Sequence, residues 1–137
     1  MPSWEHFSHD ADVGIRGIGN TVEQAFEMAA IALTAVVTIP EKVSSSITFH
    51  IHCEDSDMEL LFYDWLNALI YEMDTKKILF NKYKVHISNG VLDAECSGER
   101  VNSVSHDPAV DIKGATMTEL KVIHVKDQWI AQCIVDV

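Results

Sequence analysis

The sequence predicts an α+β fold in which two helices pack on a largely antiparallel sheet. Three observations predict this fold. Two segments repeat apolar residues at helical spacing, several others alternate apolar and polar residues, and these segments follow the order β-α-β-α-β-β-β-β. The chain has 137 residues, a length typical of one domain, and we therefore expect a single domain over residues 1–137.

The first part of the chain is expected to form a strand, a helix and a second strand. Apolar residues punctuated by glycines predict a short strand and turn over residues 12–18. Thr21, with Gln24 three residues later, has the spacing of a capping box, and the helix that follows must end before Pro40. Residues 46–53 alternate apolar and polar side chains, which predicts a half-buried strand.

A second helix is indicated by a broad apolar stripe. Ser56 is the expected N-cap, with Glu59 three residues later. The stripe repeats at intervals of three and four residues and consists of Met58, Leu61, Phe62, Trp65, Leu66, Leu69 and Met73. This pattern predicts a helix with one face buried over several turns.

The last part of the chain is expected to form two hairpins. Apolar and polar residues alternate in four segments, at residues 79–88, 91–98, 116–125 and 129–137. The first two segments flank Asn89-Gly90, a pair that favours a type I′ turn. The second two flank residues 126–128, and residues 99–112 read as a loop because they contain Pro108 and show little periodicity.

The charge balance narrows the classes of partner. Ten basic residues face 21 acidic residues, for a formal net charge of −11. Such a field repels phosphate backbones, so we expect no direct nucleic-acid binding and favour a cation or a basic protein as partner. The sequence has no apolar run of the roughly 18–20 residues that a membrane helix needs, and no signal peptide is evident. Its three cysteines form no C-x-x-C pair, so we expect a protein of the reducing cytoplasm without membrane attachment.

Two local motifs are better explained by structure than by chemistry. His50 and His52 point to one side of a predicted strand and could chelate zinc, but no third ligand follows at a recognisable spacing, so we favour a solvated strand face. Residues 105–107 (SHD) contain the residue types of a catalytic triad. Triad members meet in space rather than in sequence, and the chain has no G-x-S-x-G nucleophile motif.

Acidic residues near the two ends of the chain form a more informative set. Asp10 and Asp12 lie on the same side of an extended segment. Asp136 ends the last apolar run, next to the α-carboxylate of Val137. If the last strand is central in the sheet, Asp12, Asp136 and Val137 would supply three hard oxygen donors of the kind that Ca²⁺ or Mg²⁺ prefers. The alternative is a solvated, frayed terminus, and spacing alone favours neither interpretation.

Four segments resemble the archease family, in the same order along the chain. Their positions are 9–14 (HDADVG), which resembles H-T-A-D-V-G; 60–67 (LLFYDWLN), which resembles L-L-x-D/E-W-L-N; 98–116, which is similar to G-E…H…V-K-A-x-T; and 129–137, which resembles W-x-A-x-x-x-x-D-[VI]. Together they span essentially the whole chain. Asp10 stands where the family usually has Thr.

This resemblance implies a function. Archeases are small acidic cytoplasmic proteins that assist the GTP-dependent tRNA-splicing RNA ligase, promoting guanylylation of the ligase histidine and multiple turnover, without being enzymes themselves. The family carries a metal site, usually Ca²⁺, with Mg²⁺ or Mn²⁺ as alternatives, and the matching residues here are Asp12, Asp136 and Val137. The resemblance also implies candidates for ligase contact or support of the site, which are His9, Asp64, Glu99, His106 and Lys113. Asp10, which departs from the family pattern, is a further candidate because its carboxylate adds a possible ligand.

Two other functions remain open at this point. A metal-dependent phosphoester hydrolase would use the His and Asp residues directly, and the purified chain would then cleave generic phosphoesters by itself. A metal-free, chaperone-like interaction domain would show no Ca²⁺-dependent rise in melting temperature, whereas a metal that binds only the folded state must stabilise it by mass action.

Overall fold

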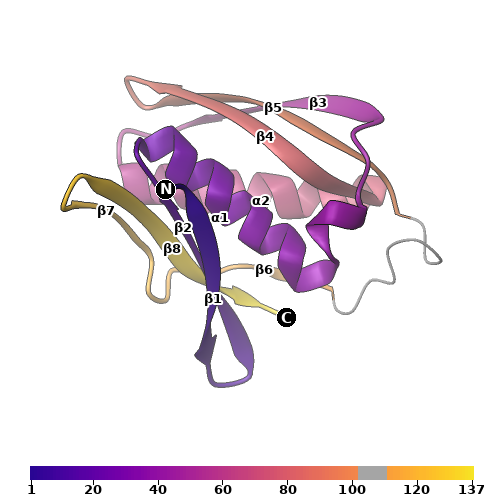
Figure 1. Ribbon diagram of the computed structural model, residues 1–137, viewed down its shortest axis with the longest axis horizontal. Helices are drawn as coiled ribbons and strands as arrows, with labels where there is room; N and C mark the ends of the chain where they lie inside the picture. The colour runs from indigo at the N-terminus through magenta and orange to yellow at the C-terminus, as the bar shows by residue number, and fades with distance from the viewer. Residues whose placement is uncertain (102–110) are drawn as a thin grey trace.

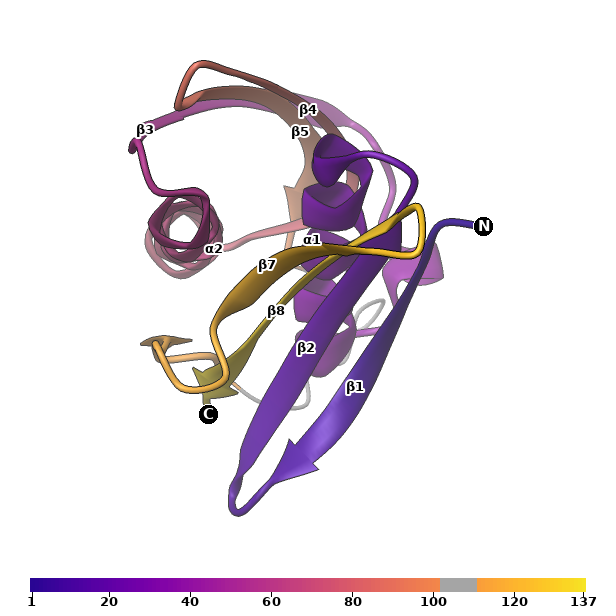
Figure 2. The ribbon, with the colours of Figure 1, turned by 90° about the vertical axis from the view of Figure 1, so that its left-hand side faces the viewer.

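Two antiparallel sheets enclose the two helices in the computed structural model, which describes residues 1–101 and 111–137 (Figures 1 and 2). The helices are α1 (Val22–Val37) and α2 (Met58–Lys76), and a 3₁₀ turn, η1 (Pro40–Lys42), follows α1. The five-stranded sheet, called sheet A, contains β1 (Ser3–His9), β2 (Asp12–Gly19), β6 (Gly114–Ala115), β7 (Lys121–Val125) and β8 (Gln128–Asp136). The three-stranded sheet, called sheet B, contains β3 (Ile47–Glu54), β4 (Ile78–Ser88) and β5 (Val91–Arg100). The predicted α+β class is confirmed.

The strand order makes β8 a central strand of sheet A. The order is β1-β2-β8-β6, and β7 also pairs with β8. Strands β2 and β8 run antiparallel over seven paired positions, from Val13 opposite Val135 to Gly19 opposite Trp129. The last strand of the described chain therefore has neighbours on both sides, as the expectation of a central last strand requires.

Each helix begins at a side-chain cap. Thr21 caps α1, because its hydroxyl oxygen accepts a hydrogen bond from the Gln24 N–H at 3.1 Å. The prediction that Ser56 caps α2 is wrong, because α2 begins one residue later and Asp57 is its cap. An Asp57 carboxylate oxygen accepts from the N–H groups of Glu59 at 2.8 Å and Leu60 at 3.1 Å. A carboxylate at this position also interacts favourably with the helix dipole.

The predicted hairpins form, with differences at their edges. Asn89 and Gly90 adopt φ of 51° and 76°, which the predicted type I′ turn requires. The second hairpin turns on Lys126 and Asp127, whose φ values of 51° and 66° are also left-handed. Strand β7 begins at Lys121, so the predicted strand over residues 116–125 forms only in its second part. Strands β1 and β6 were not predicted.

The core lies between the two sheets and is built on the helices. Trp65 of α2 is fully buried, and its indole N–H donates to the Phe26 carbonyl of α1 at 3.2 Å. On the other side of α1, Gly17 of β2 faces the backbone of Ala25 and Ala29, where a Cβ atom would clash. Small residues thus let α1 approach sheet A closely while α2 fills the space beside it with larger side chains.

The two helices are core helices. In residues 1–101 and 111–137, neither helix combines the length and the hydrophobicity that crossing a membrane requires.

Candidate functional site

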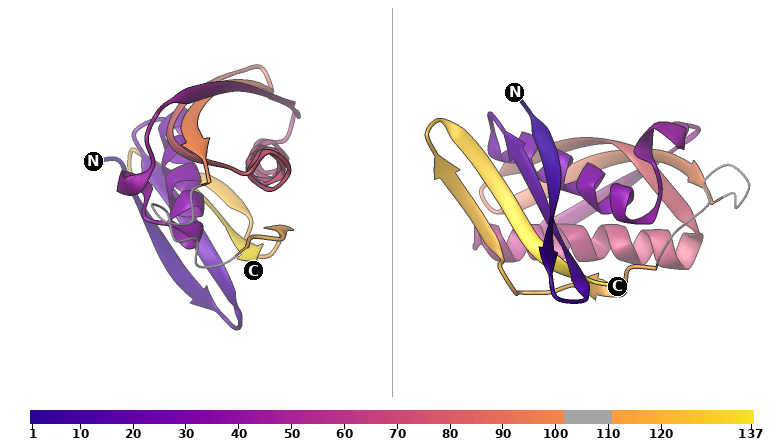
Figure 3. Two further views of the ribbon diagram at one scale, coloured as in Figure 1. Left: turned by 90° about the vertical axis from the view of Figure 1, so that its right-hand side faces the viewer. Right: turned by 60° about the horizontal axis from the view of Figure 1, so that its bottom comes forward.

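Asp12 lies beside the C-terminal end of the chain. The β2–β8 register pairs Val13 with Val135, so one further step places Asp12 opposite Asp136. The Val137 N–H donates to an Asp12 carboxylate oxygen at 3.5 Å, across 125 positions of sequence. Figure 3 shows the C-terminus, β6 and the β1–β2 turn at the same end of the molecule. The structure therefore brings together the three residues to which the family resemblance assigns the metal.

Asp136 is held from both sides. On one side β2 continues to the position of Asp12, and on the other Gly114 of β6 pairs with Asp136. The Lys113 N–H donates to the Asp136 carbonyl oxygen at 2.8 Å. A strand end with neighbours on both sides frays less than a free terminus, so the backbone that carries this carboxylate is well fixed.

His9 joins the same cross-strand row, which we call the carboxylate row: His9, Asp12 and Asp136. His9 pairs with Asp12 across the β1–β2 hairpin, and cross-strand partners carry their side chains on one face of a sheet. Val135 is fully buried in the core, so the row lies on the face of sheet A opposite to that of the Val135 side chain. Asp10 lies in the hairpin turn with φ of 52°, and the His9 ring nitrogen Nδ1 is 4.0 Å from its carboxylate.

The donor chemistry of the carboxylate row fits a hard divalent cation. Asp12, Asp136 and the α-carboxylate of Val137 offer only oxygen ligands, which suit Ca²⁺, Mg²⁺ or Mn²⁺. Among the described residues, no basic side chain forms an ion pair with Asp12 or Asp136. Nor does any group of three or more His, Cys, Asp or Glu side chains in this part of the chain have a metal-holding arrangement. A three-carboxylate site therefore needs the α-carboxylate as its third group.

Other predicted residues lie elsewhere. Asp64 is in α2, where burial and then the nearby Asp55 carboxylate raise the pKa of its side chain. Glu99 of β5 accepts hydrogen bonds from the N–H and the hydroxyl of Ser44, at 2.9 and 2.7 Å, in sheet B rather than sheet A. The structure thus does not place these two residues in the carboxylate row. His106 lies outside the described residues.

Asn67 of α2 is a residue that the sequence reasoning missed. Its side-chain oxygen accepts a hydrogen bond from the Ala115 N–H of β6 at 2.9 Å, which ties α2 to the strand beside Asp136. The signal that could have revealed it is a single amide inside the run of apolar side chains that continues from Trp65 and Leu66 to Leu69.

The histidine pair on β3 belongs to an exposed sheet surface. His52 is bonded through its two ring nitrogens, to Asp93 at 2.8 Å and to Glu54 at 2.7 Å. His50 lies 3.4 Å from the same Asp93 carboxylate. The histidines therefore contact carboxylates across the face of sheet B, which agrees with the preferred interpretation of a solvated strand face.

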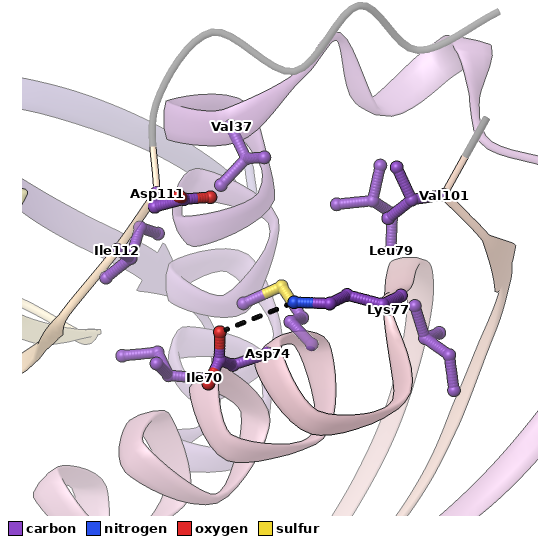
Figure 4. Close-up of a pocket in the computed structure, with 10 residues that line it drawn as sticks. Val37, Ile70, Asp74, Lys77, Leu79, Val101, Asp111 and Ile112 are labelled. Atoms are coloured by element: carbon purple, nitrogen blue, oxygen red, sulfur yellow. Dashed lines mark ion pairs between the residues drawn. The ribbon is translucent and has the colours of Figure 1, made fainter. Parts of the chain in front are cut away.

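A pocket of about 130 Å³ lies away from the carboxylate row (Figure 4). It opens at the C-terminal ends of both helices, and Asp74 and Lys77 form an ion pair of 3.8 Å beside it. Its described lining is mostly apolar and consists of Val37, Ile70, Met73, Asp74, Lys77, Ile78, Leu79, Val101, Asp111 and Ile112. It contains no residue of the carboxylate row.

Comparisons with known proteins agree on one family. A family model described as the archease protein family (MTH1598/TM1083) matches residues 4–137. Protein archease of Pyrococcus furiosus is 34% identical over 142 residues and is covered, like this chain, over 100% of its length. Protein archease of Thermococcus kodakarensis is 36% identical, with 99% of each chain covered.

Solved structures share the fold. The solution structure of protein 1598 of Methanobacterium thermoautotrophicum superposes with a TM-score of 0.87 at 29% identity, covering 98% of this chain and 99% of that one. The crystal structure of an archease of Thermotoga maritima, described as a possible chaperone, gives a TM-score of 0.67 at 18% identity. This second match covers 97% of this chain and 96% of the other, and it supports the fold alone.

Proposed function

Because the chain belongs to the archease family, we propose that it is a non-catalytic, metal-binding activator of the GTP-dependent tRNA-splicing RNA ligase. In this role it promotes guanylylation of the ligase and multiple turnover in tRNA splicing or RNA repair. The observation that carries the proposal is the contact of the Val137 N–H with the Asp12 carboxylate. This contact brings together the oxygen groups that the family resemblance assigns to the metal.

Charge supports a protein partner in this proposal. The net charge of −11 opposes contact with RNA phosphates and favours a basic surface such as a nucleotide-binding site. Asp12, Asp136 and the Val137 carboxylate would hold a divalent cation, with Ca²⁺ as the first candidate. When bound, the cation would add a positive centre that can attract phosphate oxygens. Asp12 and Asp136 are partly exposed, so a partner can approach them.

The state of the cysteines supports an accessory role. Burial raises the pKa of Cys53 to about 11, and those of Cys96 and Cys133 to about 12. Thiols with such pKa values remain protonated near neutral pH and are poor nucleophiles. We therefore assign these three cysteines to the core. The cytoplasmic location of the protein and its ligase belongs to the same proposal and rests on the family resemblance.

The proposal is tested by multiple-turnover RNA ligation with Asp12→Asn and Asp136→Asn. Each change keeps the side-chain shape and removes one carboxylate charge from the carboxylate row. We expect stimulation of the ligase to fall by at least about tenfold, because lost metal contacts commonly weaken affinity or activity by factors of this order. The measured quantity is the number of ligated products per ligase molecule over time.

Glu95→Gln is the matched control. Glu95 is exposed on β5, in sheet B, so this variant loses one carboxylate charge away from the carboxylate row. It should stimulate the ligase as the unmodified protein does. Full stimulation by both Asn variants would refute the assigned site. If Ca²⁺ also failed to raise the melting temperature of the unmodified protein, a metal-free chaperone-like role would be favoured.

A further inference from the structure

We propose that Asn67 is a positioning residue for the cation site, acting through β6 on the end of β8. The inference rests on the proposed metal-binding function and extends it to a residue that is not itself a ligand. Asn67 belongs to the helix layer, whereas Asp12 and Asp136 belong to sheet A. The chain of contacts between them has three steps.

The first step joins α2 to β6. The Asn67 side-chain oxygen accepts the Ala115 N–H at 2.9 Å and lies 3.6 Å from the position that a Cβ atom on Gly114 would occupy. Trp65 and Leu66, the two residues directly before Asn67, are fully buried, so packing fixes the rotation of α2 about its axis. The amide oxygen is therefore presented to β6 from a rigid element.

The second step joins β6 to β8. Strand β6 has only two residues, and they pair with the last two residues of β8: Gly114 with Asp136 and Ala115 with Val135. Hydrogen bonds flank this pairing, from the Lys113 N–H to the Asp136 carbonyl at 2.8 Å and from the Thr116 N–H to the Ile134 carbonyl at 3.0 Å. A two-residue strand is too short to hold itself in place, so it needs an anchor outside the sheet.

The third step joins β8 to Asp12. Strand β2 is the only other neighbour that the described chain gives to the end of β8, and the contact from Val137 to Asp12, at 3.5 Å, is at the limit of a hydrogen bond. If β6 moved away, Asp136 would lie at an open sheet edge with one neighbour. Asn67 thus acts on the spacing of the carboxylates in the way that groups outside a metal's ligand shell orient its ligands.

The test measures Ca²⁺ affinity of the purified protein by the rise of melting temperature with Ca²⁺ concentration, so it needs no ligase. Asn67→Ala removes the acceptor and keeps helix propensity high, and we expect Ca²⁺ binding to weaken by about tenfold or more. Asn67→Asp keeps an oxygen acceptor in the same place, and its affinity should stay within about threefold of the unmodified protein. Amide hydrogen exchange of Ala115 in the metal-free protein should accelerate in Asn67→Ala only.

Asn81→Ala is the matched control. The Asn81 side chain also bonds a backbone group, donating to the Val43 carbonyl at 2.7 Å, but it lies on β4 of sheet B. This variant should lose stability and keep its Ca²⁺ affinity. Equal Ca²⁺ affinity of Asn67→Ala and the unmodified protein would overturn the inference alone, and so would a failure of Asn67→Asp to retain affinity. An unmodified protein that does not respond to Ca²⁺ would overturn both the inference and the metal site.

Discussion

Gly17 is the residue at which the packing of α1 against sheet A is most sensitive. A Cβ atom there would overlap the Ala25 carbonyl oxygen and the Ala29 backbone. Since both are backbone atoms of a helix, the clash cannot be relieved by a side-chain rotation. We expect Gly17→Ala to destabilise the protein by about 1–3 kcal/mol, the usual cost of overpacking a core.

Urea denaturation measures this cost, with Gly114→Ala as the comparison. A Cβ on Gly114 would meet only the Asn67 side-chain oxygen, at 3.6 Å, which is an ordinary contact. That variant should unfold within about 0.5 kcal/mol of the unmodified protein. Equal midpoints for the two variants would show that α1 shifts freely and that Gly17 is not needed for close packing.

Helix caps show how far residue-level prediction reaches. Before α1, Asn20 and Thr21 are both residue types that cap helices, and the spacing from Thr21 to Gln24 identified the right one. Before α2, Ser56 and Asp57 are adjacent and either can cap a helix, and the spacing to Glu59 favoured the wrong one. The choice depends on which residue leaves the strand conformation first, and the path of the chain from β3 decides that.

At the level of elements, the exposed face of sheet B carries a histidine, His52, that contacts two carboxylates. His52 lies between Glu54 and Asp93, and hydrogen bonds to these two carboxylates raise its pKa above the ordinary value of 6.5. The hydrogen bond between His52 and Asp93 lowers the pKa of the Asp93 carboxyl group. Because the folded-state pKa of His52 is raised, its contribution to stability is fully present below pH 6.5 and is lost as pH rises through the folded pKa.

The titration of His52 can be followed by NMR. Glu54→Gln removes the largest cause of the shift, so we expect the His52 pKa to fall toward its ordinary value. Glu95→Gln, which changes a carboxylate that does not contact this ring, should leave the His52 pKa where it is. An unchanged His52 pKa in Glu54→Gln would mean that the ion pair seen here does not persist in solution.

The two strands that escaped prediction, β1 and β6, did so for different physical reasons. In β1, Trp4 pairs with Gly17 and Phe7 pairs with Gly14, and an odd separation of three places these two apolar side chains on opposite faces of the sheet. No alternation is visible, because β1 is an edge strand that carries an aromatic side chain on each face. Strand β6 has two residues, and its existence depends on Asn67 and β8 rather than on its own sequence.

At the scale of the whole molecule, the proposed metal site can be tested through the terminal carboxylate that the proposal includes. Adding Gly-Ser after Val137 moves the terminal carboxylate away while Asp12 and Asp136 stay in place. We expect the Ca²⁺-dependent rise in melting temperature to fall to less than half, because one of three oxygen groups is lost. The same dipeptide added before Met1 is the control and should change nothing. An undiminished rise with the C-terminal extension would exclude that carboxylate as a ligand.

The sequence identifies the candidate site residues more readily than it predicts that they lie close together. Asp12 and Asp136 stood out as carboxylates beside strand-like segments, and the family resemblance pointed to the same two residues. Their proximity depends on the β2–β8 pairing across more than a hundred residues, which no local pattern encodes. The hydrogen bond between Asn67 and Ala115 cannot be predicted from the sequence for the same reason, since the two residues lie 48 positions apart.

The central place of β8 in sheet A also determines the order in which the two sheets can fold during synthesis. A ribosome releases β8 after every other described element, so β2, β6 and β7 must wait with unpaired edges until it emerges. Sheet B has all of its strands earlier in the chain and can close first. A nascent chain stalled before Gln128 would expose the unpaired edges of these three strands to neighbouring chains, and such edges favour aggregation.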